Sequence, residues 1–200
     1  MAWSTRLVLA STSPRRRVLL EQVGIAFNVV APTYVERDLL AASPEELVER
    51  HAVGKAESVH RLTPDRVVIG VDTVVVLDGK DDSTVVHGKP PTFDAARGML
   101  TALSGRSHRV LSGLCVLGPS YRTTAVESTT VTFRRVDEQQ LTWYLDTGEW
   151  EGLAGGYAIQ GRAAAFVTSI DGDYFNVVGL PVAALTRILD EAFPGEIAFV

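Results

Sequence analysis

An almost uninterrupted apolar run at residues 66–77, rich in valine and broken near its middle by Asp72, limits the fold more than any other feature. β-Branched residues without polar alternation favour a strand that is covered on both faces. Such a strand is typical of a sheet that lies between helices. A buried carboxylate without a partner would cost several kcal/mol, so Asp72 is either a hydrogen-bonded structural residue or a metal ligand or general base.

Helical and strand patterns alternate along the rest of the chain, with capping signals such as Ser43-Pro44-Glu45-Glu46 before several helices. Strands are expected at residues 7–10, 27–31, 66–77, 85–87, 108–117 and 124–135, and helices at 14–23, 43–60, 92–103, 137–145 and 181–193. A hairpin turn at residues 78–81 would join two of these strands. The pattern predicts an α/β or mixed α+β fold with a central mixed sheet flanked by helices.

Composition narrows the class of protein. The chain has 200 residues, of which 46% are hydrophobic, and this fits one globular domain or two small lobes sharing a cleft. A net charge of −5 argues against a nucleic-acid polymer as partner. No apolar run approaches the roughly 20 residues of a membrane helix, and no signal peptide is evident, so we expect a cytoplasmic protein. The single cysteine, Cys115, is expected to be a buried thiol within a strand.

The N-terminal segment has the pattern of an anion site. Ser11 and Ser13 lie in a hydroxyl-rich turn after the first strand, with Ser13 at the expected N-cap, and three arginines, Arg15, Arg16 and Arg17, follow Pro14. A helix N-terminus carries partial positive charge and disfavours cations, so this cluster predicts a bound anion such as phosphate. A solvated basic helix end is the alternative.

Two lysines and a glycine-rich segment add candidates. Lys55 falls within the apolar stripe of helix 43–60 and either faces inward or extends along the helix to solvent, whereas Lys89 stands in a loop. Residues 148–161 hold five glycines, and Gln160 could pair with a nucleobase edge, although a flexible loop would look the same. The histidines are expected at the surface, because they occur in no catalytic pattern; they are His51, His60, His87 and His108.

Five segments resemble, in order, the signatures of the Maf nucleoside triphosphate pyrophosphatases, also described as septum formation inhibitors. They are residues 11–16, 70–75, 88–90, 154–161 and 176–181. The resemblance implies one domain over residues 1–200, with an elongated Maf/ITPase-like sheet and a cleft between two lobes. It also implies hydrolysis of a nucleoside triphosphate to monophosphate and pyrophosphate, a divalent metal (Mg²⁺, with Mn²⁺ and Co²⁺ as further candidates) and a homodimer.

The same resemblance assigns roles to residues. Asp72 matches the catalytic carboxylate that activates water, and Glu36 together with Asp72 matches the acidic metal positions. The phosphate-binding positions are matched by Ser11, Ser13, Arg15, Arg16, Lys55 and Lys89. Arg15, Thr73 and Gln160 match the group that prefers dTTP and UTP, and a neutral Gln amide suits the uracil or thymine edge.

Two alternatives stay open from the sequence. The chain could act on 7-methyl-GTP or another non-standard triphosphate, or it could be a nucleotide-binding regulator of cell division that does not turn its ligand over. Asp72 favours the enzyme, because a pure binder gains nothing from a carboxylate beside an anionic ligand unless the carboxylate also holds metal.

Overall fold

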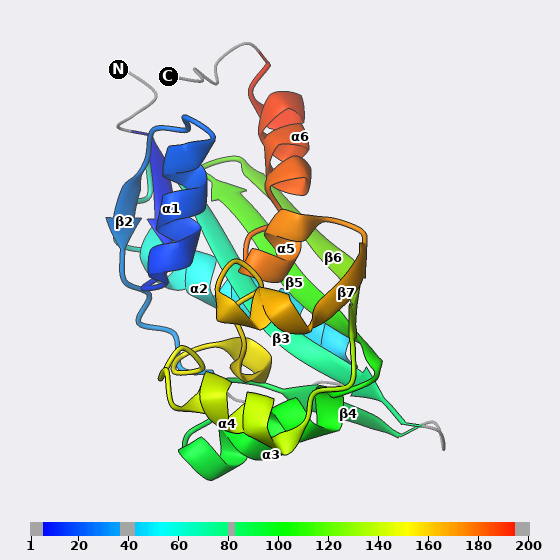
Figure 1. Ribbon diagram of the computed structural model, residues 1–200. Coiled ribbons are helices and arrows are strands. Elements are labelled where there is room, and N and C mark those ends of the chain that lie inside the picture. Colours follow the sequence, from blue (N-terminus) through cyan, green and yellow to red (C-terminus); the bar gives the residue numbers. More distant parts are fainter. Residues whose placement is uncertain (1–5, 37–42, 80–82, 195–200) are drawn as a thin grey trace. The chain divides into compact units, whose positions relative to one another are not determined.

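The computed structural model describes residues 6–36, 43–79 and 83–194 (Figure 1). The strands are β1 (Leu7–Ala10), β2 (Asn28–Val30), β3 (Val67–Asp78), β4 (Thr84–His87), β5 (Ser107–Gly118), β6 (Tyr121–Phe133) and β7 (Val167–Asp171). The helices are α1 (Pro14–Gln22), α2 (Pro44–His60), α3 (Phe93–Leu103), α4 (Glu138–Leu145), α5 (Tyr174–Val178) and α6 (Val182–Ala192), with 3-10 turns at Ala154–Gly156 and Arg162–Phe166. The strand order is β2-β1-β3-β5-β6-β7, and β4 also pairs with β3, so the predicted mixed sheet is confirmed.

The chain divides into two compact units, and strands β3, β5 and β6 each contribute to both. In the first unit (residues 1–72, 112–127 and 179–200), β1 pairs in parallel with β2 and with β3, where Ala10 lies opposite Gly70. The backbone of helix α2 packs directly against β3 at Gly70. A Cβ on Gly70 would collide with the Ala52 carbonyl oxygen, so only glycine allows this close approach. The core between them is apolar and includes the buried Cys115, whose pKa is raised to about 11 by burial.

The second unit covers residues 73–111 and 128–178. The second half of β3 pairs antiparallel with β4, and β6 pairs antiparallel with β7. Helices α3 and α4 lie side by side (Figure 1). Asn176 of α5 is fully buried and donates through Nδ2 to the Val110 carbonyl and to Thr129 Oγ1, both at 3.0 Å. These bonds tie the short helix to β5 and β6.

Helix starts follow their caps closely. Ser43 accepts from the Glu46 amide, Thr92 accepts from the Ala95 amide, and Asp137 forms a complete capping box with α4. Ser13 occupies the N-cap position of α1 as predicted, but its side chain makes no capping bond.

The remaining differences concern strands and short elements. The strand expected at 124–135 runs instead from Tyr121 to Phe133, and β7 and α5 were not predicted. Lys80 and Asp81 of the expected hairpin turn lie outside the described residues. Among the helices of the described ranges, none combines the length and the apolar character needed to cross a membrane.

Candidate active site

Asp72 is the centre of the candidate site in the first unit. It lies on β3 with only 7% of its surface exposed, and its two carboxylate oxygens have different neighbours. Lys55 Nζ lies 2.5 Å from Oδ1, and His51 Nδ1 lies 3.4 Å from Oδ2. Lys55 Nζ is also 2.6 Å from Glu36 Oε1, in the segment after β2. The partner that the buried position of Asp72 requires is therefore Lys55, on the inward face of α2. Of the two orientations that the sequence left open for Lys55, the structure has the inward one.

The electrostatics of this cluster keep Asp72 charged. Burial by itself raises the pKa of Asp72, but the hydrogen bond with His51 and the positive charge of Lys55 outweigh it and hold the pKa below its usual value. The same hydrogen bond raises the pKa of His51. At neutral pH the site thus contains a buried carboxylate that can accept a proton or a hydrogen bond without first having to ionise.

The N-terminal end of α1 brings Ser11 and Arg16 together. Arg16 donates through Nε to the Gly179 carbonyl at 2.8 Å and through Nη1 to Ser11 Oγ at 3.4 Å. The Ser13 amide donates to the same hydroxyl at 3.1 Å, which explains why Ser11 rather than Ser13 organises the turn. Burial lowers the pKa of Arg16 to about 10, against the opposing effect of Asp72, so the guanidinium stays charged at neutral pH.

The other two arginines of the cluster differ from each other. The charge of Arg15 contributes to the lowered pKa of Arg16, so two guanidinium groups lie near each other at this helix end. Arg17 instead points away and forms an exposed ion pair with Glu21, its Nε lying 2.7 Å from Oε1. Of the three arginines, Arg15 and Arg16 therefore stay candidates for the predicted anion site, and Arg17 does not.

The second unit carries the lysine loop and the glycine-rich segment. Lys89 is exposed after β4, and the Gly155 amide donates to the Gly88 carbonyl at 3.0 Å, so the two segments lie side by side. Gly155 has a φ of +67°, and a Cβ there would lie 2.7 Å from Val75 Cγ2, which makes glycine necessary at this contact. Gln160 is exposed a few residues further on, and Thr73 is half-buried on β3.

The prediction that the histidines lie at the surface is wrong for two of them. His51 and His108 are each 2% exposed, whereas His60 and His87 are half-buried. His51 is four residues before Lys55 on α2 and therefore shares its inward face, a signal that was present in the sequence. His108 lies in the second unit, where its Nε2 is 2.9 Å from Tyr157 Oη and its ring packs edge-on against Phe133.

Three side chains of the first unit fit a divalent cation. Glu36, His51 and Asp72 each offer one ligand atom, and these atoms lie within 4.8 Å of one another. Opposite ligands of an octahedral ion are about 4.2 to 4.6 Å apart, so small side-chain movements would bring the three onto one ion. The donor set supports the metal expected at Glu36 and Asp72.

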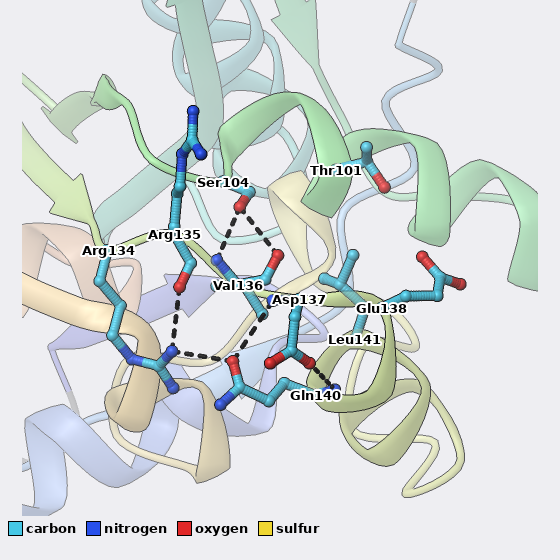
Figure 2. Close-up of a pocket in the computed structure, with 9 residues that line it drawn as sticks. All are labelled: Thr101, Ser104, Arg134, Arg135, Val136, Asp137, Glu138, Gln140 and Leu141. Carbon is cyan, nitrogen blue, oxygen red and sulfur yellow. Dashed lines mark hydrogen bonds between the residues drawn. The ribbon is translucent and has the colours of Figure 1, made fainter.

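A pocket in the second unit is unrelated to these residues. Figure 2 shows that it lies between Ser104, Arg134 and the start of α4, where Arg134 Nη1 donates to Gln140 Oε1 at 2.8 Å. The backbone N–H of Gln140 donates to Asp137 Oδ1 at 2.8 Å. No residue expected to bind substrate lines the pocket.

The fold and site define a mixed α/β protein with a buried, ionised aspartate, Asp72. The positively charged side chains of Lys55 and Arg16 lie near it, and the acidic Glu36 shares its contact with Lys55. Residues 6–192 match the family model described as Maf-like protein, and the chain belongs to this family. It is 47% identical to the dTTP/UTP pyrophosphatase of Symbiobacterium thermophilum over 186 residues, which cover 93% of each chain. The enzymes of the same name from Bacillus pumilus and Pyrococcus abyssi are 43% and 42% identical, over 92% and 94% of this chain and 95% and 96% of theirs.

Proposed function

We propose that this chain is a nucleoside triphosphate pyrophosphatase that hydrolyses dTTP and UTP to the monophosphate and pyrophosphate. The observation that carries the proposal is Asp72, a buried carboxylate that is kept ionised by its hydrogen bond with His51 and by the positive charges of Lys55 and Arg16. Relatives that align over more than nine-tenths of the chain bear the name dTTP/UTP pyrophosphatase. We further expect a cytoplasmic enzyme that acts on free nucleotides and forms a homodimer.

The reaction breaks the bond between the α-phosphorus and the oxygen that bridges to the β-phosphate. A water oxygen forms the new bond to the α-phosphorus, and pyrophosphate leaves with the bridging oxygen. Asp72 orients this water and accepts its proton, while Lys55 and Arg16 offset the charge on the phosphate oxygens. A divalent cation held by Glu36 and Asp72, Mg²⁺ or else Mn²⁺ or Co²⁺, would polarise the phosphate and the water when bound.

Substrate binding and choice are assigned to the remaining residues. Ser11, Ser13, Arg15 and Lys89 bind the triphosphate, and Gln160, with Arg15 and Thr73, selects the pyrimidine. The Gln160 amide can donate to the O4 carbonyl and accept from the N3–H of uracil or thymine, whereas a Glu at this position would suit the two neighbouring N–H donors of guanine. A preference for 7-methyl-GTP or another non-standard triphosphate would instead appear as a higher kcat/KM for that nucleotide in a substrate panel.

Replacing Asp72 by Asn tests the catalytic assignment, because the change keeps the size of the side chain and removes its charge. We expect kcat for dTTP to fall by about 10²-fold or more, with nucleotide binding retained. Asp78→Asn is the matched control, since Asp78 ends the same strand, is exposed and pairs with Arg109. Near-normal turnover by Asp72→Asn would remove Asp72 from catalysis.

The same turnover assay distinguishes the enzyme from the alternative of a nucleotide-binding regulator without turnover. If the wild-type protein binds dTTP tightly but releases no pyrophosphate with any cation, the chain is a nucleotide-binding module and not an enzyme. The free energy of unfolding of Asp72→Asn must be measured in parallel, because loss of the Lys55 ion pair could also destabilise the first unit.

A further inference from the structure

The function proposed above uses His51 only through its hydrogen bond with the central carboxylate, Asp72. His51 lies on α2, is 2% exposed, and packs edge-on against Tyr34 with ring centroids 5.8 Å apart. Its Nδ1 faces Asp72 Oδ2, whereas Lys55 occupies the other oxygen, Oδ1. The two sides of the carboxylate are thus divided between an ammonium group and an imidazole nitrogen.

The spacing on the imidazole side suits two ligands of one metal ion. His51 Nδ1 and Asp72 Oδ2 are 3.4 Å apart. Two neighbouring ligands bound at about 2.2 Å, with an angle of about 100° at the ion, lie about 3.4 Å from each other. A carboxylate oxygen of Glu36 falls within the same 4.8 Å group. Lys55 Nζ contacts Asp72 through Oδ1, the oxygen that does not face His51, and it also lies 2.6 Å from Glu36 Oε1.

We propose that His51 is the third protein ligand of this cation site, through Nδ1, and that it makes the site favour Co²⁺ over Mg²⁺. Mg²⁺ prefers oxygen ligands and keeps its water, whereas imidazole is a good ligand for later transition metals. Two carboxylates alone would not discriminate in this way. The inference rests on the proposed function only for the expectation that the site holds a divalent cation.

A purely orienting role for His51 predicts a different pattern. An imidazole that only hydrogen-bonds Asp72 would still affect metal affinity, because such outer contacts are worth about 10- to 100-fold. Replacing such an imidazole would, however, weaken the binding of all cations alike, and in the wild type no nitrogen would lie on the metal. Affinity for one metal is therefore insufficient, and the test needs both a selectivity ratio and a direct signal from nitrogen.

The experiment uses the full chain without nucleotide. Mn²⁺ is bound as a paramagnetic probe, and pulsed EPR measures coupling to ¹⁴N, while calorimetry gives Kd for Co²⁺ and for Mg²⁺. We expect imidazole nitrogen coupling in the wild type and its loss in His51→Leu, with the Kd ratio of Mg²⁺ to Co²⁺ falling by about tenfold or more. His60→Leu, on the same helix, should change neither.

Glu36→Gln completes the design, because it should weaken the binding of every cation and yet keep the nitrogen coupling. Absence of Mn²⁺ binding, absence of coupling in the wild type, or an unchanged metal ratio in His51→Leu overturns the inference. These outcomes are independent of the proposed function. Turnover of dTTP without nitrogen coupling refutes His51 as a ligand and leaves the pyrophosphatase assignment intact. Nitrogen coupling without turnover supports His51 as a ligand and refutes the pyrophosphatase assignment.

Discussion

Acidification should destabilise the protein through His108. This side chain is 2% exposed among aromatic rings of the second unit, and burial, with a smaller effect of the His87 charge, lowers its pKa from 6.5 to about 4. The folded state therefore binds fewer protons than the unfolded state between these values. The contribution to stability is complete above the unfolded pKa and is lost as the pH falls towards the folded pKa.

The size of the effect follows from the shift. At about 1.36 kcal/mol per pKa unit, the full shift corresponds to about 3 kcal/mol, of which about 2 kcal/mol is lost between about pH 7.5 and pH 5. Urea unfolding at the two pH values gives the free energy of unfolding of the wild type and of His108→Gln, which cannot titrate. We expect the wild type to lose about 2 kcal/mol more than the variant on acidification.

Carboxylates also titrate over this interval, but they do so in both proteins and cancel in the comparison. Tyr157→Phe is the second control, since it removes the hydroxyl partner of His108 Nε2 and leaves the histidine buried. It should keep the steep pH dependence of the wild type. Parallel curves for the wild type and His108→Gln would refute the reasoning, because they would mean that His108 gains its proton as easily when folded as when unfolded.

Two further substitutions have defined outcomes. Gln160→Glu replaces a hydrogen-bond donor with a charged acceptor. It should lower the ratio of kcat/KM for UTP to that for GTP by a factor that corresponds to about 1 to 3 kcal/mol. An unchanged ratio would remove Gln160 from base selection. Gly155→Ala should lower the free energy of unfolding by about 2 kcal/mol more than Gly152→Ala, as measured in urea, because both have a φ of +67° but only Gly155 has Val75 against the new Cβ. Equal losses would show that the contact is adaptable.

The fold was predictable where the signals are local. Helices α2, α3 and α4 begin within a residue of their predicted starts, because their caps at Ser43, Thr92 and Asp137 are short-range patterns. Strand β7 was missed since it is mostly exposed and carries little apolar alternation, and α5 is too short, at five residues, for a helical period. Their placement depends on long-range bonds such as that of Asn176 to Val110.

The candidate site was only partly predictable. An aspartate within an apolar strand and a lysine on an apolar helix face each required a partner, but their pairing at 2.5 Å depends on how α2 packs against β3. His51 escaped prediction because histidine is common at surfaces, and its inward position appears only when the helical spacing from Lys55 is followed. The Gly179 carbonyl that accepts from Arg16 is separated from it by 163 residues, and no local pattern indicates it.

The central claim is that water attacks the α-phosphorus of dTTP or UTP. The most direct measurement is turnover of dTTP, UTP and GTP by the wild-type protein in ¹⁸O-labelled water with a divalent cation, followed by mass spectrometry of both products. The account predicts faster turnover of dTTP and UTP than of GTP, with one ¹⁸O in the monophosphate and none in pyrophosphate. Label in pyrophosphate, or release of inorganic phosphate and a diphosphate, would contradict it.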